Sequence, residues 1–322
     1  MPQATNYPGG FSSGLTVQNL PITIPHPGKV FWVNNSTALA EGGIGGSNSN
    51  PGTYTKPFST LDYAIGKCTA HRGDVIYVMP GYTQSMTAAD DVDVDVAGVT
   101  IIGLGRGTKV PKFTYDNSAG EFVIGAVNVH IENLWFVPSV TGITKAIDVE
   151  SGSTFFEIVK CRFGDAETAG TDEFNATIIV AATSTDGKII GNYINMGEAG
   201  AVAGITITGA DSRLEIRDNT ILGDYSTACI NSITTLQSDL IITNNLLVNG
   251  VTSGLNTEPT IELLTGSSGV LANNYSAANV STLAAHQVND TAANFQNFYT
   301  EDRGSAATAA ATAASITASA DD

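Results

Sequence analysis

Six short segments of the chain share one pattern, in which an aliphatic residue is followed two positions later by a polar residue. The segments are Ile131–Asn133, Ile158–Lys160, Ile190–Asn192, Ile216–Asp218, Ile242–Asn244 and Leu271–Asn273. Consecutive segments begin 26 to 32 residues apart, so the chain contains an imperfect internal repeat. A repeat of this length indicates a solenoid, in which each unit packs on the unit before it.

A second set of aliphatic runs precedes the first set, and the first isoleucine of each run lies 10 to 12 residues before the segment that follows it. These runs cover residues 146–149, 177–180, 204–207, 228–230 and 260–263. All the runs are short and rich in Ile, Val and Thr, which favours strands over helices. A coil with two or three strands of ~4 to 6 residues, at ~3.3 Å per residue, is the size of one turn of a β-helix. We therefore predict an all-β chain folded as a right-handed parallel β-helix.

The first set of segments also predicts which side chains stack along the axis. Its aliphatic column consists of Ile131, Ile158, Ile190, Ile216 and Ile242, and we expect all five in the core. Asn219, Asn245 and Asn274 directly follow the polar position in the last three segments. Because Asn tolerates the left-handed backbone region, these residues fit tight bends. Their stacked amides can also hydrogen-bond to one another along the axis.

The chain divides into four parts. Residues 1–28 contain five prolines, which forbid a long helix and favour an extended arm. Residues 29–72 predict a strand at 29–33, a Gly-rich loop at 42–52 and an amphipathic helix at 59–68 that plugs the open end of the solenoid. The β-helix occupies residues 73–275, and residues 276–322 form a C-terminal extension with an Ala/Thr-rich tail. The arm is expected to contact a partner through Phe11, Leu15, Val17, Leu20, Ile22 and Ile24.

Composition limits the partners and the setting. The formal net charge is −17 with only 14 Lys and Arg, which argues against nucleic-acid binding because phosphates need clustered cations. No apolar stretch reaches the ~18 to 20 residues of a membrane span, and no secretion signal is visible at the N-terminus. The three cysteines lie in apolar runs without metal-site spacing, so we expect buried free thiols and folding in a reducing cytoplasm.

The richest carboxylate run is 90–96, where Asp and Val alternate strictly after the first two Asp residues. The alternation places the valines on one strand face and Asp91, Asp93 and Asp95 on the other, which is typical of a solvated face. These three carboxylates could also hold a cation weakly. Asp148 and Glu150 form another pair two residues apart, without an evident Lys or Arg at matching positions of the next coil. We therefore predict no catalytic residues, no metal and no cofactor.

Two further motifs leave alternatives open. Trp135 and Phe136, with Tyr115, could be core residues or a sugar-binding subsite, and the core is favoured. Residues 72–74 spell Arg-Gly-Asp, but the Asp opens a core strand, so we interpret the tripeptide as a chance match.

Residues 25–33, 48–53, 56–61 and 72–81 carry a resemblance to a known group of proteins. Their motifs include Pro-Phe-Ser-Thr-Leu at 57–61 and Gly-Asp-Val-Ile-Tyr-Val-Met-Pro-Gly at 73–81. Together they resemble the start of pectate-lyase-like β-helix proteins among the structural proteins of tailed bacteriophages. The resemblance covers residues 1–105 by motif and the rest by fold. It implies a virion component, made in the host cytoplasm and usually homotrimeric, that contacts the major capsid protein or another virion protein.

The resulting hypothesis is a non-enzymatic capsid decoration protein. The alternative is a tailspike or tail-fibre protein that binds or degrades polysaccharide, because the same fold supports that activity. A secreted carbohydrate lyase is a third possibility, which the lack of a visible signal disfavours.

Overall fold

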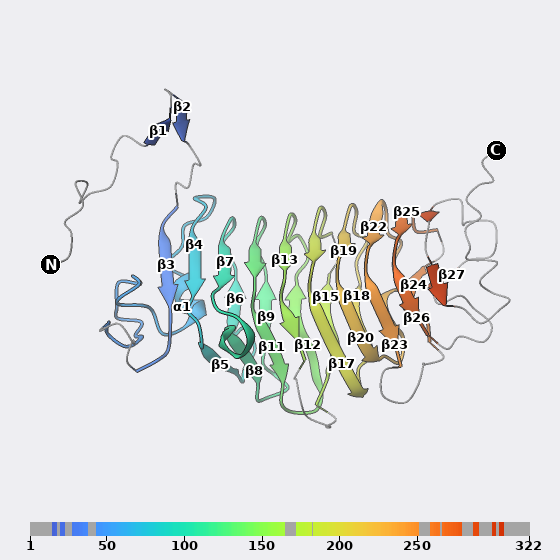
Figure 1. Ribbon diagram of the computed structural model, residues 1–322, viewed down its shortest axis with the longest axis horizontal. Coiled ribbons are helices and arrows are strands. Elements are labelled where there is room, and N and C mark those ends of the chain that lie inside the picture. The colour runs from blue at the N-terminus through green and yellow to red at the C-terminus, as the bar shows by residue number, and fades with distance from the viewer. Residues whose placement is uncertain are drawn as a thin grey trace.

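The computed structural model describes residues 28–37, 43–164, 172–181, 183–250, 258–264 and 266–278, together with the backbone of 15–17, 20–22, 286–289, 298–300 and 303–305. The main body is a parallel β-solenoid, as the repeat predicts (Figure 1). Each complete coil contributes one strand to each of three parallel sheets. Every strand between the two end strands of a sheet therefore pairs with the corresponding strands of the coil before it and the coil after it.

We name the three sheets by their strands. Sheet 1 consists of β3 (Val30–Val33), β4 (Val75–Val78), β7 (Thr100–Gly103), β10 (His130–Glu132), β13 (Glu157–Val159), β16 (Lys188–Ile190), β19 (Glu215–Arg217), β22 (Leu240–Thr243), β25 (Gly269–Ala272) and β28 (Phe298–Thr300). Sheet 2 consists of β5 (Thr83–Met86), β8 (Lys112–Tyr115), β11 (Trp135–Pro138), β14 (Arg162–Phe163), β17 (Tyr193–Ala199), β20 (Thr220–Asp224), β23 (Leu246–Asn249), β26 (Tyr275–Ala277) and β29 (Arg303–Ser305). Sheet 3 consists of β6 (Val92–Val94), β9 (Phe122–Ile124), β12 (Ile143–Val149), β15 (Phe174–Val180), β18 (Ala203–Ile207), β21 (Ala228–Ser232), β24 (Ile261–Leu264) and β27 (His286–Asn289).

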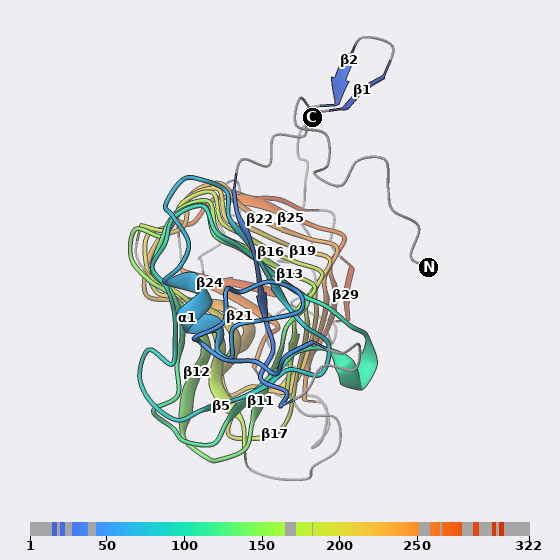
Figure 2. The ribbon, with the colours of Figure 1, turned by 90° about the vertical axis from the view of Figure 1, so that its left-hand side faces the viewer.

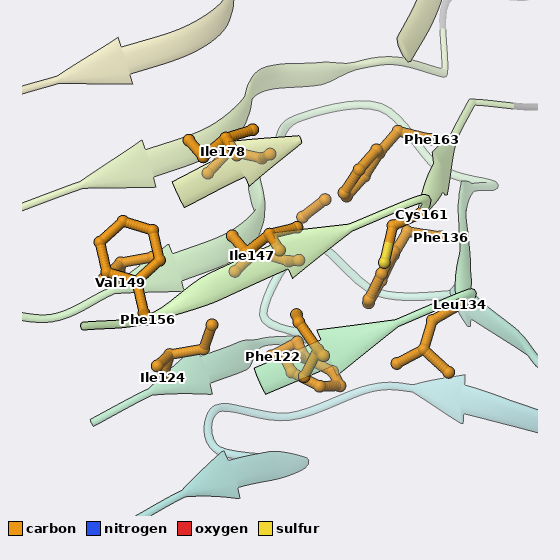
Figure 3. Close-up of a cluster of buried hydrophobic side chains, with 14 of the residues drawn as sticks. Phe122, Ile124, Leu134, Phe136, Ile147, Val149, Phe156, Cys161, Phe163 and Ile178 are labelled. Atoms are coloured by element: carbon orange, nitrogen blue, oxygen red, sulfur yellow. The ribbon is translucent and has the colours of Figure 1, made fainter. Parts of the chain in front are cut away.

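The two predicted ladders are the core columns of sheets 1 and 3. In sheet 3 the register joins Ile147, Ile178, Ile205, Ile230 and Ile261, and all five are fully buried. Between these sheets and sheet 2, aromatic rings fill the interior, and Phe136 stacks on Phe163 with ring centroids 5.0 Å apart (Figure 3). This assigns Phe136 to the core, as the sequence favours.

One residue of the sheet 1 column was predicted wrongly. Ile158 pairs with Ile189 and not with Ile190, and Ile189 pairs in turn with Ile216. Ile189 is fully buried, whereas Ile190 is half-exposed on the outer face. Because side chains alternate along a strand, a slip of one residue moves the whole strand to the other face. Two adjacent isoleucines satisfy the aliphatic pattern equally well, so the pattern alone could not choose between them.

The bend from sheet 1 to sheet 2 is made by a residue in the left-handed region. This residue has a φ between 50° and 67° in six successive coils, at Asn133, Lys160, Gly191, Asp218, Asn244 and Asn273. The buried asparagines predicted to make the bend come one position later. The left-handed conformation therefore belongs to the exposed or half-exposed position, and the next residue turns inward.

The inward-turning residues form an asparagine ladder, which consists of Asn192, Asn219, Asn245 and Asn274. Each is at most 1% exposed. The Asn219 amide donates to Oδ1 of Asn245 at 3.0 Å and to the Ile189 carbonyl at 2.9 Å. Its own Oδ1 accepts from the backbone N–H and the amide of Asn192. Every polar atom of this side chain thus has a partner inside the core, which is the condition for burying an amide.

The N-terminal end is closed by β3 and by α1 (Leu61–Ile65), which lie against the first coil (Figure 2). Leu61, Ala64 and Ile65 are buried, and Cys68 is half-exposed but packs on the core. The helix is shorter than the predicted 59–68. Asn48 of the Gly-rich loop holds the two residues that precede the helix, because its Oδ1 accepts from the backbone N–H groups of Ser59 and Thr60.

Asp74 joins the cap to the first coil. Its fully buried carboxylate accepts two hydrogen bonds from Arg72 and one each from the backbone N–H groups of Lys29 and Thr69. Burial opposes ionisation of Asp74, but the Arg72 guanidinium and these N–H groups outweigh it and lower the pKa of Asp74. The Arg-Gly-Asp tripeptide is therefore a structural contact, because its Asp carboxylate is not accessible to a receptor.

Strand pairing is also described near both ends of the chain. Within the arm, β1 (Leu15–Val17) and β2 (Leu20–Ile22) pair antiparallel, so this stretch folds back on itself. Phe11 and Ile24 lie outside the described residues. At the other end, β27, β28 and β29 continue the three sheets, so strand pairing extends past residue 275.

We expect Asn245→Leu to destabilise the protein by about 3 kcal/mol, because it removes the acceptor of the backbone N–H and of one amide N–H of Asn219 and the side-chain donor to the Ile216 carbonyl, all inside the core. Denaturant unfolding would measure the change. Asn244→Gly is the matched control, because glycine accepts the φ of 58° at that position. Equal stability of Asn245→Leu and the wild type would contradict a structural role for the ladder.

Candidate functional site

A group of acidic side chains lies on the outer face of sheet 3, over its first three strands, and on the adjoining helix α1. We call this group the acidic strip; it consists of Asp62, Asp91, Asp93, Asp95, Glu121, Asp148 and Glu150. Strand alternation positions it as predicted. Val92 and Val94 are fully buried, whereas Asp91 and Asp93 are half-exposed and Asp95 is exposed.

The three aspartates proposed as a weak cation site do not act as one set. Asp91 Oδ2 accepts from the backbone N–H groups of Thr87 and Ala88, so this carboxylate closes a turn. Asp93 and Asp95 remain on the open face. Within the part of the chain that the structure describes, no group of three or more His, Cys, Asp or Glu side chains is arranged to hold a metal ion.

The structure instead brings together Asp93 and Glu150, which are two coils apart. Both lean over Gly125, the residue of the intervening coil that has no side chain. Oε2 of Glu150 and Oδ1 of Asp93 lie 3.2 and 3.5 Å from the point where a Cβ on Gly125 would stand. The two oxygens are therefore no more than about 7 Å apart.

The surroundings of Asp93 favour its protonated form. Burial raises its pKa most, and the charges of Asp95, Asp90, Glu150 and Asp62 raise it further. A carboxyl with a raised pKa beside a second carboxyl is the pattern of a general acid and its partner. The sequence signal that could have found this pair is Gly125, a small residue between two acidic coils.

Lys145 is a basic residue that pairs with two carboxylates of the acidic strip. The sequence analysis looked for Lys or Arg in the next coil and therefore missed Lys145, which lies on the same strand as Asp148. Its ammonium pairs with Asp148 on the same strand and with Oε1 of Glu121 at 3.3 Å. Burial alone lowers the pKa of Lys145, but the hydrogen bond and charge of Asp148 and the charge of Glu121 raise it on balance. Lys145 therefore stays charged and neutralises this end of the strip, away from the Gly125 position.

Trp135, for which the sequence favoured the core, lies instead on the outer face of sheet 2. Its ring carries the Arg162 guanidinium at 4.4 Å and the Lys112 ammonium at 5.8 Å from its centroid, and its indole N–H donates to the Gly164 carbonyl at 2.7 Å. Contacts with cations from both neighbouring coils leave little of the ring for stacking on a sugar. Tyr115, by contrast, is fully buried.

Within the part of the chain that the structure describes, the cysteines and His130 show no sign of reactivity. Cys161 and Cys229 are buried, and burial raises the pKa of Cys161 and of Cys68 to about 12. These thiols therefore stay protonated and inert. His130 points outward, as predicted, where Nδ1 lies 2.8 Å from Glu157 of the next coil.

A buried acid that the sequence did not single out lies at the bend between sheets 3 and 1. Asp211 is 2% exposed and stacks between Ser184 and Gln237 in a polar column. Its Oδ1 accepts from the Ser184 N–H at 2.7 Å, whereas its buried Oδ2 has no hydrogen-bond partner. Burial raises the pKa of Asp211 to about 7.

The raised pKa makes stability depend on pH. The folded protein retains the Asp211 proton where the unfolded chain has lost it, so stability should fall as pH rises from about 4 to about 7. We expect Asp211→Asn to remove this decline and to stabilise the protein at pH 8 by about 3 kcal/mol. Thermal unfolding measured from about pH 4 to pH 8 would test this pH dependence, with the exposed Asp239→Asn as control. Identical pH profiles of wild type and Asp211→Asn would contradict the assignment.

Comparison with known proteins supports the fold and not an activity. No protein-family model and no curated protein matches the sequence. Among solved structures, the GH136 lacto-N-biosidase from Eubacterium ramulus is similar with a TM-score of 0.55 and 12% identity, over 77% of this chain and 56% of that one. A rhamnogalacturonan lyase is similar with a TM-score of 0.46 and 13% identity, over 80% of this chain and 76% of that one. At 12% identity the likeness to the lacto-N-biosidase shows a shared β-solenoid fold and no more. Among the described residues, no helix is long and apolar enough to cross a membrane.

Proposed function

We propose that the chain is a non-enzymatic structural protein of a bacteriophage virion, a homotrimeric decoration protein on the capsid. The observation that carries the proposal is the arrangement of the motifs that resemble phage proteins. They form one unit, in which β3, α1 and β4 close the end of the solenoid around Asp74. This unit is the part of the molecule nearest to the arm in sequence.

The arm is the proposed attachment segment. Because α1 already buries Leu61, Ala64 and Ile65 over the first coil, closure of the core does not require residues 1–28. Six large apolar side chains there could each contribute ~1.5 to 3 kcal/mol on full burial against a partner. The partner is the major capsid protein or another virion protein.

We expect deletion of residues 1–24 to leave the melting temperature of the solenoid nearly unchanged and to abolish binding to particles. The deletion ends before Lys29, whose N–H bonds to Asp74, so the cap stays intact. Co-sedimentation with particles that lack the protein would measure binding, with the full-length chain as control. Full occupancy by the truncated chain would exclude the arm as the anchor.

A second candidate function is supported by the Asp93 and Glu150 pair. The proximity of the two carboxyl groups and the raised pKa of Asp93 would suit hydrolysis of a glycosidic bond, with Asp93 as the acid and Glu150 as base or nucleophile. In a virion this activity would belong to a tailspike or tail fibre that degrades host polysaccharide. The structural role is preferred because Asp91 is engaged in a turn and the face around the pair offers no described aromatic platform.

The two functions differ in a direct assay. For the structural protein we expect no release of oligosaccharide from host capsule or from uronate polymers, with or without Ca²⁺, above a heat-killed control. If sugar is released, Asp93→Asn and Glu150→Gln should each reduce the rate by at least about 100-fold, while Asp95→Asn should not. That pattern would establish the enzymatic alternative.

A further inference from the structure

The outer face of sheet 2 differs from the rest of the surface. Its first outward row runs along the axis, one residue per coil, through Thr83, Lys112, Trp135, Arg162, Tyr193, Thr220, Leu246 and Tyr275. A second row, two residues further along each strand, contains Ser85, Thr114, Val137, Asn195, Leu222, Val248 and Ala277. In a chain with a net charge of −17, none of these described residues is acidic.

The described outer faces of the other two sheets do carry acidic residues. Sheet 3 carries the acidic strip, and the outer face of sheet 1 carries alternating charges in which Glu157 pairs with both His130 and Lys188. On sheet 2, Asp116 and Asp224 border the two rows at the ends of β8 and β20. Asp116 accepts hydrogen bonds from the hydroxyls of Ser85 and Ser139.

Along the axis the face changes from cationic and aromatic to apolar. Arg162 lies between the rings of Trp135 and Tyr193, at 4.4 and 6.0 Å from their centroids. Further along, Leu246 and Tyr275 are register partners and are 44% and 64% exposed. A surface row that contains Tyr, Trp, Arg and Leu and no acidic residue has a composition typical of the centre of a protein interface.

We propose that sheet 2 is the face through which copies of this chain associate. Two molecules of charge −17 repel each other, so they can approach closely only through surfaces that lack carboxylates. The outward rows of sheet 2 meet this condition, whereas the described outer faces of sheets 1 and 3 do not. Nine strands at ~4.8 Å spacing give this face a length of roughly 38 Å, enough for a specific interface.

A polysaccharide fits this face less well than a second copy. The Trp135 ring is covered by Arg162 and Lys112 of the adjacent coils, so it cannot serve as a sugar platform. Thr220 and Leu246 separate Tyr193 from Tyr275 along the row, so these rings form no continuous platform. The inference rests on the proposed homo-oligomeric state and names the surface that forms it.

The test is sedimentation velocity of the full-length chain over a wide concentration range. The wild type should self-associate, and Leu246→Glu and Tyr275→Glu should each weaken association by about tenfold or more. Ile241→Glu is the matched control: Ile241 belongs to the same coil as Leu246, is 36% exposed, and lies on sheet 1. It should associate like the wild type. If a glutamate variant does not fold, Leu246→Gln takes its place with the same expected direction.

Three outcomes would overturn the inference: a monomeric wild type, an assembly that tolerates both sheet 2 variants, or an Ile241→Glu variant as impaired as Leu246→Glu. The second and third outcomes would not contradict the virion role, because the copies would then associate through another face. Self-association without binding to particles would contradict the virion role and not the inference about sheet 2.

Discussion

Every part of this structure depends on the parallel stacking of coils ~4.8 Å apart, which places each residue directly beside its counterparts in the coils before and after it. Similar side chains therefore meet in columns. Aliphatic columns become a continuous core, and the asparagine ladder becomes a chain of amides in which each satisfies the next. A buried amide without such a neighbour would be costly, so the column is stable only as a set.

The stacking of residues in columns also explains where unfavourable interactions occur in the structure. Asp211 occupies a polar column in which Gln237 and the serines can each donate a hydrogen bond, but an ionised carboxylate cannot donate. Its second oxygen is left without a partner, and the charged form is disfavoured. Glycine has a comparable effect on the surface: the missing side chain at Gly125 lets Asp93 and Glu150 approach across an intervening coil.

Stacking also divides the exterior into three faces with separate roles. Because each outward row collects one position from every coil, small biases in residue choice add up over the length of the solenoid. Sheet 1 has paired charges, sheet 3 begins with an acidic strip, and sheet 2 is free of acids in its described outward rows. A protein that presents such different faces can bind different partners along its sides while its core stays uniform.

The sequence by itself determined the solenoid, the columns of sheets 1 and 3, the cap with its helix, and the alternation of Val92 and Val94 with outward aspartates. These features follow from residue type and spacing along one strand, which are visible in one dimension. The strands of sheet 2 were not recognised, because they follow the bend directly and contain mixed residue types. Only the tertiary structure decided that Ile189 and not Ile190 faces the core, that Asn192 belongs to the asparagine ladder, and that Asp93 lies near Glu150. Each of these depends on the register between coils of unequal length, which is decided by packing across the axis and not by the order of residues along it.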